Sequence, residues 1–314
     1  MSMPAATSPR DWRIALVGYG EVGRILAEDL RAQGIEVGAC DTKLAQGGAP
    51  AEAMRAHAES HGVRLADSHV AAVADAALVV SAVTASQTLA VARACAPGLS
   101  PGAWFLDFNS ASPGAKQAAA SLVDGAGARY VEGAVMTSVP PHRLRVPLLL
   151  GGEHAARLAP LLREIGFAAE FASPRLGVAS ATKMCRSIMI KGLEAMVIEA
   201  YTTARAYGVE DAVLASLAET FPGIDWEKQG TYFFGRVIQH GRRRAEEVRE
   251  VAQTVREAGL DPWSADGTAR RQAWVADLAD GGLFGDRAAS RSDWRIEADR
   301  ILAAIRQPNH RPDG

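Results

Sequence analysis

The chain has 314 residues, of which 48% are hydrophobic and 22% charged, a composition typical of a globular protein long enough for two domains. Its formal net charge of −2 gives no reason to expect nucleic acid or an anionic membrane as a partner. The three cysteines, Cys40, Cys95 and Cys185, are widely spaced and show no metal-type pairing, so we expect reduced thiols rather than a disulfide framework.

The sequence shows no targeting or membrane segment. The first twelve residues lack the apolar run of a signal peptide, and no stretch approaches the roughly 18 continuous apolar residues of a membrane helix. The last eight residues, 307–314, are polar and contain two prolines, so we expect them to fray. These features predict a cytoplasmic protein.

Short apolar runs alternate with helix-length segments through the first half of the chain. The expected strands are residues 13–17, 35–40, 77–83, 104–108, 130–135 and 146–150. A first helix is expected over 21–33, between the first two of these strands. Strands separated by helices indicate βαβ units, and therefore an α/β fold with a mainly parallel, doubly wound sheet of the Rossmann type.

The second half of the chain has an all-helical pattern. The expected helices are residues 180–207, 211–219, 226–258, 268–278 and 294–306. The break near Ser173 and Pro174 predicts a dinucleotide-binding domain over 1–172 and a helical domain for substrate binding and dimerisation over 173–314. The helix at 180–207 is apolar on more than one face, so we expect a second copy of the chain to cover it in a homodimer.

A glycine-rich turn follows the first predicted strand and leads directly into the first predicted helix. Its residues are Gly18, Tyr19, Gly20, Glu21, Val22 and Gly23. In a turn of this pattern the first glycine permits the bend, the second lets the backbone approach a pyrophosphate, and the third lets helix and strand pack closely. The helix N-terminus offers free N–H groups and a positive dipole to the phosphates. The alternative is a bare βα turn with incidental glycines.

An acidic residue in the expected place supports the dinucleotide site. Asp41 ends the second predicted strand, 18 positions beyond Gly23, close to the spacing of about 20 typical of a ribose-binding acid. Its carboxylate would accept hydrogen bonds from the ribose hydroxyls and repel a 2′-phosphate, which favours NAD. Lys43 follows closely and partly offsets that repulsion, so NADP is not excluded. Val83 and Thr84, at the end of the third predicted strand, and Asn109, after the fourth, complete the expected cofactor site.

Two further segments carry a family resemblance. Residues 106–113 (LDFNSASP) and 177–183 (GVASATK), together with the glycine turn, resemble segments of the β-hydroxyacid dehydrogenase family, which includes 3-hydroxyisobutyrate and 6-phosphogluconate dehydrogenases. The first resembles the strand end beside the nicotinamide, and the second resembles GxGxxxK at the start of the catalytic helix, with Ala179 replacing the second glycine. Residues 183–187, 191–195 and 240–247 resemble a branch with a distinctive helical C-terminal domain, often named phosphogluconate dehydrogenase-like.

The chain departs from this family where the substrate binds. The family's substrate motif, near DAPVSGG, stands here as EGAVMTS, so Met136, Thr137 and Ser138 replace the serine and paired glycines that cradle a substrate carboxylate. The asparagine usually found four residues after the catalytic lysine is Ser187. Transferring either familiar substrate would therefore rest on analogy of fold alone.

The resemblance implies that Lys183 takes or gives the proton of the substrate hydroxyl. Ser187, one helical turn further on, would hydrogen-bond the substrate in place of the asparagine. Lys191, a second turn on, would bind an anionic group or favour proton loss from Lys183 by like-charge repulsion. The alternative for Lys191 is a buttress paired with Glu194 or with a carboxylate of a partner chain.

Ser110 and two histidine-containing segments complete the candidates. Ser110 is expected near the nicotinamide or substrate, the alternative being turn capping before the proline that follows. His240 begins a run with Arg242–Arg244 that is typical of a solvated helix face, although His240 and one arginine could close over an anionic substrate end. His57 and His61 have the i, i+4 spacing of a metal pair, but no third ligand or HExxH pattern accompanies them. We expect a surface helix there and no metal site.

These features together predict an NAD(P)-dependent oxidoreductase that acts on a small, anionic hydroxy acid or on the matching aldehyde or ketone. Imine reduction is a second hypothesis, which the retained Lys183 disfavours because imine-reducing relatives of this architecture usually lack that lysine. A dinucleotide-binding sensor without turnover is the third, and the altered substrate motif supports it.

Overall fold

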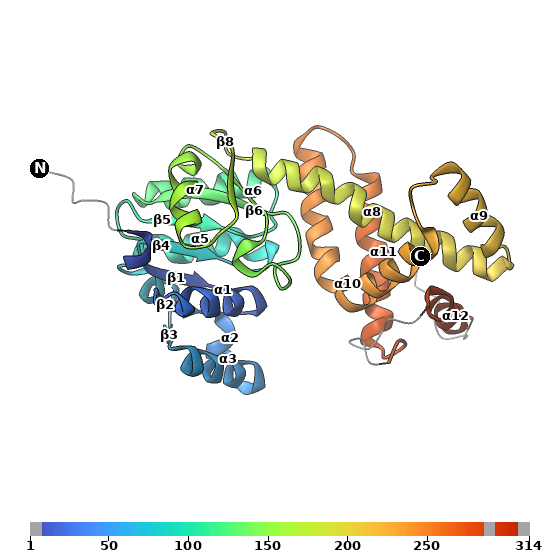
Figure 1. Ribbon diagram of the computed structural model, residues 1–314, viewed down its shortest axis with the longest axis horizontal. Helices are drawn as coiled ribbons and strands as arrows, with labels where there is room; N and C mark the ends of the chain where they lie inside the picture. The colour runs from blue at the N-terminus through green and yellow to red at the C-terminus, as the bar shows by residue number, and fades with distance from the viewer. Residues whose placement is uncertain (1–7, 286–292, 307–314) are drawn as a thin grey trace, which may run out of the picture. The chain divides into compact units, whose positions relative to one another are not determined.

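The computed structural model describes residues 8–285 and 293–306, so the expected fraying of 307–314 lies outside the described residues. The chain divides into two compact units, Met1–Met184 and Cys185–Gly314. Figure 1 shows that the first unit is built on a sheet and the second on helices. Among the described helices, none has the length and apolar character needed to cross a bilayer.

The first unit contains one eight-stranded sheet with the order β3-β2-β1-β4-β5-β6-β7-β8. Its strands are β1 (Arg13–Val17), β2 (Glu36–Cys40), β3 (Arg64–Leu65), β4 (Leu78–Ser81), β5 (Trp104–Asp107), β6 (Arg129–Val135), β7 (Leu148–Gly151) and β8 (Ala169–Ser173). β6 and β7 run antiparallel, and the other neighbouring pairs are parallel. The predicted mainly parallel, doubly wound sheet is confirmed.

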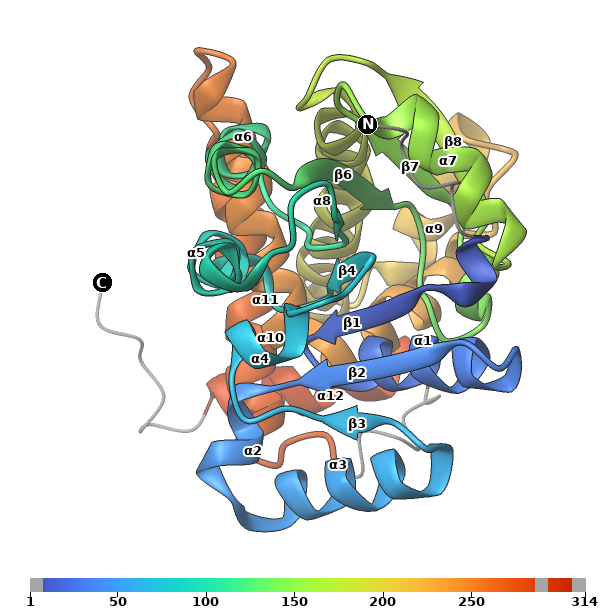
Figure 2. The same cartoon turned by 90° about the vertical axis from the view of Figure 1, so that its left-hand side faces the viewer.

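Helices cover both faces of this sheet. Successive strand residues point to opposite sides, and in these strands both sides are apolar, so each face needs a covering layer. Ile14 and Leu16 of β1 pack into one apolar cluster, and Ala15 and Val17 pack into the other. The helices that contribute to the first cluster are α1 (Glu21–Ala32), α3 (Gly48–His61) and α7 (Ala155–Glu164). Those that contribute to the second are α4 (His69–Val73), α5 (Thr88–Cys95) and α6 (Pro113–Gly125). Figure 2 shows α5 and α6 on one side of the strands and α1 and α7 on the other.

The second unit is helical. Its helices are α8 (Val178–Tyr207), whose first turns belong to the first unit, α9 (Glu210–Thr220), α10 (Trp226–Glu257), α11 (Trp263–Asp280) and α12 (Trp294–Ile305). Tyr201, Phe234, Val237 and Trp294 lie in its apolar core. At Gly241 an added Cβ would lie 2.8 Å from the carbonyl oxygen of Gln272, so this glycine allows α10 and α11 to approach closely.

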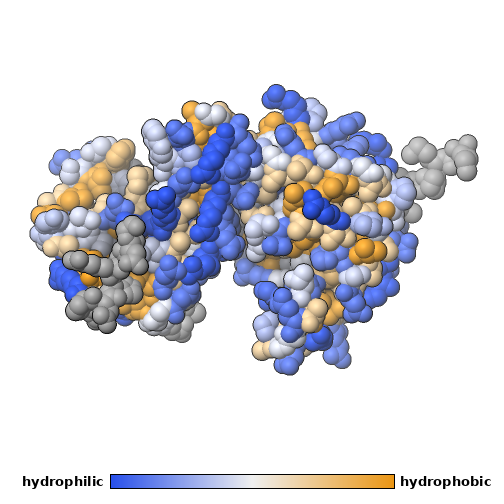
Figure 3. Space-filling view, turned by 180° about the vertical axis from the view of Figure 1, so that it is seen from behind, coloured by the Kyte–Doolittle hydropathy of each residue, from blue (hydrophilic) through white to orange (hydrophobic). Residues whose placement is uncertain are grey.

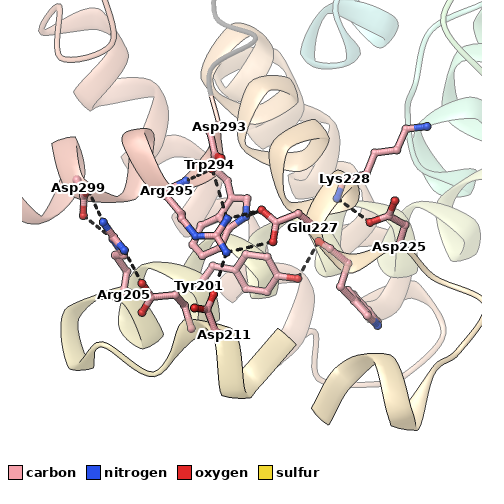
Figure 4. A network of polar contacts seen from close by, with 12 residues as sticks. Tyr201, Arg205, Asp211, Asp225, Glu227, Lys228, Asp293, Trp294, Arg295 and Asp299 are labelled. Atoms are coloured by element: carbon pink, nitrogen blue, oxygen red, sulfur yellow. Dashed lines mark hydrogen bonds and ion pairs between the residues drawn. The ribbon is translucent and has the colours of Figure 1, made fainter. Parts of the chain in front are cut away.

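A polar network fastens α12 to the rest of the helical unit (Figure 4). Arg205 of α8 pairs with Asp299 of α12, with 2.8 Å between Nε and Oδ1. Trp294 Nε1 donates to Glu227 Oε1 of α10 at 3.0 Å, and Tyr201 OH donates to the backbone oxygen of Trp226 at 3.0 Å. Buried aromatic rings thus keep partners for their polar atoms.

The last strand of the sheet, β8, places the end of the first unit further along the chain than the sequence predicted. β8 was not predicted, because Glu170, Phe171 and Ala172 are exposed and the strand lacks a buried apolar run. The boundary predicted after residue 172 therefore falls inside β8. The contacts group β8 and the start of α8 with the first unit, up to Met184.

Candidate dinucleotide site and active site

The three glycines of the turn after β1 have different surroundings. Gly18 has a φ of +96°, and a Cβ there would lie 2.4 Å from the carbonyl oxygen of Ala82. A Cβ at Gly23 would lie 2.1 Å from the carbonyl oxygen of Gly18. A Cβ at Gly20 would meet no described atom within 4 Å. Gly18 and Gly23 are therefore needed by the fold, whereas Gly20 leaves open space at the cap of α1, where backbone N–H groups can bind phosphate.

Asp41 joins the glycine turn to the end of β2. Its Oδ2 accepts a hydrogen bond from the backbone N–H of Tyr19 at 2.9 Å. Its Oδ1 accepts one from the N–H of Lys43, also at 2.9 Å, and so caps α2 (Thr42–Gln46). Each carboxylate oxygen has a further lone pair. The side chain is half-buried beside the turn, where a ribose-binding acid is expected.

Asn109 ties the end of β5 to the end of β4. Its Oδ1 accepts from the backbone N–H of Val83 at 2.7 Å, and its Nδ2 donates to Ser81 Oγ at 3.0 Å. The residue is only 3% exposed, so its amide fixes the loop that presents Val83 and Thr84. Val83 is half-buried and Thr84 exposed, directly beyond β4.

A buried polar cluster lies beneath this strand end, and sequence reasoning missed it. Asp107 Oδ1 accepts from the Asn109 N–H at 2.8 Å and from Lys116 Nζ at 2.9 Å. Tyr130 OH donates to Asp107 Oδ2 at 2.7 Å. Burial, and to a smaller extent the negative charge of Asp107, raises the pKa of Tyr130 well above its ordinary value. The only sequence signal was an acid at the end of an apolar strand, because the lysine and tyrosine come from other elements.

Ser110 and Lys183 meet at the same strand end. Lys183 Nζ donates to Ser110 Oγ at 2.5 Å, and both residues are half-buried. The two residues are 73 positions apart in the chain, so no local sequence pattern indicates this contact. It brings the lysine of the GxGxxxK-like segment to the carboxyl edge of the sheet.

Glu132 fixes the helix start that carries Lys183. Its Oε1 accepts from the backbone N–H groups of Gly177 and Ala179, at 2.8 and 3.1 Å, and its Oε2 accepts from Ser180 Oγ at 2.8 Å. The carboxylate is fully buried. A negative group at a helix N-terminus is stabilised by the helix dipole and by the free amides there. Sequence reasoning treated this residue only as part of the altered substrate motif.

The residues that replace the family's substrate motif follow β6 directly. Met136 and Ser138 are half-buried and Thr137 is exposed. The Met136 N–H donates to the backbone oxygen of Pro147 at 2.9 Å, which fixes the start of this segment. β4, β5 and β6 are parallel neighbours, so their carboxyl ends lie along one edge, where ligands bind in open α/β sheets.

Ser187 and Lys191 belong to the helical unit, and both are 7% exposed. Lys191 Nζ donates to Glu247 Oε2 at 2.6 Å, so its carboxylate partner is Glu247 and not Glu194. Burial, partly offset by Glu247, lowers the pKa of Lys191. Glu194 instead binds the buried guanidinium of Arg244, whose Nε lies 2.9 Å from Oε2.

His240 is half-buried on α10, and the arginines that follow it are ion-paired within the helical unit. Arg242 Nη2 lies 2.6 Å from Asp277 Oδ1 and 2.5 Å from Asp280 Oδ2. Arg243 Nη1 lies 2.6 Å from Glu247 Oε1, one turn along the helix. The three arginines of this run are thus held by intramolecular salt bridges, two of them to carboxylates of other helices.

A glycine turn after β1, an acid after β2 and a lysine beside the end of β5 are the features of a Rossmann-type dinucleotide-binding domain with a candidate acid–base group at its carboxyl edge. The family model for the NAD binding domain of 6-phosphogluconate dehydrogenase matches residues 13–172, and a model for a domain of unknown function, DUF1932, matches residues 204–275. The chain belongs to the β-hydroxyacid dehydrogenase family, in the branch with this helical C-terminal domain.

Solved structures agree with this assignment. A conserved hypothetical protein from Sinorhizobium meliloti 1021 is 34% identical, with a TM-score of 0.74 over 93% of this chain and 96% of that one. A conserved protein of unknown function, described as structurally similar to 3-hydroxyacid dehydrogenases, is 29% identical, with a TM-score of 0.66 over 86% and 99%. A 3-hydroxyisobutyrate dehydrogenase from Mycobacterium tuberculosis, solved with L-serine, is 18% identical, with a TM-score of 0.66 over 93% and 99%, and shows the fold alone.

Proposed function

We propose that the protein is an NAD-preferring dehydrogenase that transfers hydride between nicotinamide and a small anionic hydroxy acid, or its matching aldehyde or ketone. The observation that carries the proposal is the 2.5 Å hydrogen bond between Lys183 Nζ and Ser110 Oγ at the carboxyl edge of the sheet. This contact brings a proton-carrying group to the edge where cofactors bind in such sheets. The same edge carries the glycine turn and Asp41.

The residues present fit a nicotinamide dinucleotide. Gly20 leaves open space at the N-terminus of α1, where backbone N–H groups would bind the pyrophosphate. Asp41 would accept hydrogen bonds from the ribose hydroxyls, and Val83 and Thr84 would line the path toward the nicotinamide. The cofactor, when bound, supplies the hydride acceptor or donor.

Lys183 is the proposed general acid and base. In the oxidation direction its neutral amine takes the proton of the substrate hydroxyl at Nζ, and in reduction its ammonium returns a proton to the carbonyl oxygen. Ser110 is a positioning residue, because it holds Nζ at the strand end. Met136, Thr137 and Ser138 follow β6 along this edge and would shape the substrate pocket.

The substrate class is tested by a screen of small hydroxy acids, their aldehydes and ketones, and cyclic imines. The absorbance of NADH measures turnover of each compound. We expect turnover of at least one hydroxy acid or its carbonyl form. Faster turnover of cyclic imines than of every hydroxy acid would instead indicate an imine reductase. Binding of NAD(H) without turnover of any compound would contradict the proposal and favour a sensor.

The role of Lys183 is tested with Lys183→Ala and the matched control Lys228→Ala, which alters an exposed lysine of α10. Loss of general acid–base catalysis predicts a fall in kcat on the order of 10²–10⁴-fold for Lys183→Ala. NAD(H) binding, followed by fluorescence, should be unchanged in both variants. Turnover by Lys183→Ala at the control's rate would exclude the proposed proton transfer.

A further inference from the structure

Two histidines of α3 and one glutamate of α1 converge beside the glycine turn. One ligand atom from each of Glu28, His57 and His61 lies within 4.8 Å of the other two, and all three residues are half-buried. The sequence showed only the i, i+4 pair of histidines. The third ligand lies on another helix, 29 positions before His57, so no local pattern could reveal it.

The two imidazoles take part in one chain of hydrogen bonds with Tyr19, Glu28 and the backbone of α3. His57 Nδ1 contacts Tyr19 OH at 2.8 Å, and its Nε2 faces Glu28 Oε1 at 3.0 Å. His61 Nδ1 contacts the backbone oxygen of His57 at 2.9 Å and Ser60 Oγ at 2.8 Å. The two rings stack with their centroids 4.3 Å apart.

This arrangement matches the surroundings of metal-binding histidines. A ligating imidazole usually donates its other ring N–H to a carbonyl, carboxylate or water, which fixes the tautomer and the ring orientation. When an ion takes the place of the proton between His57 Nε2 and Glu28, His57 would carry its hydrogen on Nδ1 and donate it to the Tyr19 hydroxyl, and His61 would donate from Nδ1 to a backbone carbonyl. The Nε2 lone pairs would then be available to that ion.

The carboxylate of Glu28 is held in its charged form. Hydrogen bonds from His57 and then from Arg143 keep the pKa of Glu28 below its ordinary value. Arg143 Nη2 binds the other oxygen, Oε2, at 2.6 Å, and leaves Oε1 facing His57. The positive charge of Arg143 is itself paired with Asp29, whose Oδ1 lies 2.7 Å from Nε.

We propose that Glu28, His57 and His61 bind one divalent transition-metal ion of the zinc class, at a site separate from the nicotinamide and substrate positions. Two imidazole nitrogens and one carboxylate oxygen form a ligand set that suits Zn²⁺ and leaves a fourth position for water. The ion would replace the proton that His57 and Glu28 share and would link α1 to α3. Tyr19 belongs to the glycine turn, so its hydroxyl connects this site to the dinucleotide-binding loop.

The test uses the full chain with any affinity tag removed and Zn²⁺ as the probe. Titration calorimetry measures the affinity and the number of ions bound per chain. We expect one ion per chain. Glu28→Gln, His57→Ala and His61→Ala should each weaken binding by tenfold or more, while the control His69→Ala, which alters a histidine of α4, should bind as the unmodified chain does. Tyr19→Phe keeps all three ligands, and we expect it to weaken binding by about tenfold because it removes a partner of His57.

A second probe separates a defined site from loose surface binding. Co²⁺ bound at this site should give visible absorption bands that Zn²⁺ displaces and that His61→Ala abolishes. NAD(H) binding and the far-ultraviolet circular dichroism of the Glu28, His57 and His61 variants should stay unchanged, which separates loss of the metal site from misfolding and from failure of the proposed dehydrogenase function. Absence of one-to-one Zn²⁺ binding at micromolar protein, or equal binding by the unmodified chain and a His57→Ala/His61→Ala double variant, would overturn the proposal.

Discussion

The glycines of the turn after β1 make separable contributions, because their neighbours differ. Gly18 and Gly23 stand against backbone oxygens, and Gly20 faces open space. The requirement for glycine at positions 18 and 23 comes from the fold. At Gly20 the requirement for glycine comes from the ligand that we propose occupies the open space at the N-terminus of α1.

A pair of alanine variants tests this distinction. Gly20→Ala should lose no more than about 1 kcal/mol of unfolding free energy, because alanine is a weaker N-cap of α1, but bind NAD(H) more weakly, because its methyl group enters the proposed phosphate space. Gly23→Ala should lose about 1–3 kcal/mol of unfolding free energy, because its Cβ would lie 2.1 Å from the oxygen of Gly18. Urea titration and NADH fluorescence measure both effects. Equal NAD(H) affinity of Gly20→Ala and the unmodified chain would place the phosphates elsewhere.

Asp41 is expected to decide the choice between NAD and NADP. Asp41→Ser removes the charge that would repel a 2′-phosphate and keeps a residue type that caps helices well, as α2 requires. We expect the ratio of NADPH to NADH affinity to rise by about tenfold, equivalent to about 1.4 kcal/mol. Titration of both coenzymes against the variant measures it. Tighter binding of NADPH than of NADH by the unmodified chain would contradict the argument.

At the scale of elements, the start of α8 depends on one buried carboxylate. Glu132→Ala would leave the amides of Gly177 and Ala179 without their acceptor, whereas the hydroxyl of Ser180 keeps the backbone oxygen of Gly177 at 3.1 Å. Buried groups that lose a partner cost about 1–3 kcal/mol each, so we expect a fall of at least about 2 kcal/mol in unfolding free energy. Glu132→Gln keeps one acceptor oxygen and should lose less. Chemical denaturation compares the two, and equal stabilities would exclude the capping role.

The helical unit contains a buried charge pair between Arg244 of α10 and Glu194 of α8. Arg244→Met leaves the Glu194 carboxylate buried and unpaired, and breaking one side of such a pair typically costs about 3–5 kcal/mol. Replacing both residues, as in Arg244→Met with Glu194→Leu, should recover most of that loss. A double-mutant cycle by urea unfolding measures the coupling, and additive effects of the two changes would argue against it.

At the scale of the whole molecule, α8 has apolar side chains on two sides. Val197, Ile198 and Tyr201 are buried in the core of the helical unit, whereas Met189 is 71% exposed and Met196 is 60% exposed. Ile190, at 41%, is also exposed. Figure 3 shows hydrophobic residues among hydrophilic ones on the surface of this unit seen from behind. Exposed apolar side chains gathered on one helix favour association.

We therefore expect a homodimer in which a second copy covers this side of α8. Light scattering at micromolar concentration should give twice the mass of the chain. Met189→Glu with Met196→Glu should shift the mass toward that of a monomer, because two charges would then have to be buried. The control Tyr232→Glu alters an exposed aromatic residue of α10 and should leave the dimer intact. A monomeric unmodified chain would contradict the prediction.

Local sequence patterns were sufficient to predict much of the fold. The strands β1, β2 and β4 to β7 are short apolar runs, and the long helices have apolar periodicity, so both could be predicted within a few residues. β3 has two residues and β8 is mostly exposed, so neither carries a pattern that a sequence alone reveals. The glycine turn and Asp41 could be predicted because their spacing is itself the signal.

The sequence by itself determined the class of protein, because a strand, a glycine turn, a helix and an acid follow one another within the first 41 residues. Only the tertiary structure decided the partners: Ser110 for Lys183, Glu132 for the start of α8, Glu247 for Lys191, and Glu28 for His57. The physical reason is that hydrogen bonds and ion pairs act over a few ångströms in space. These pairs are 29 to 73 positions apart in the chain, where no periodic pattern connects one residue to the other.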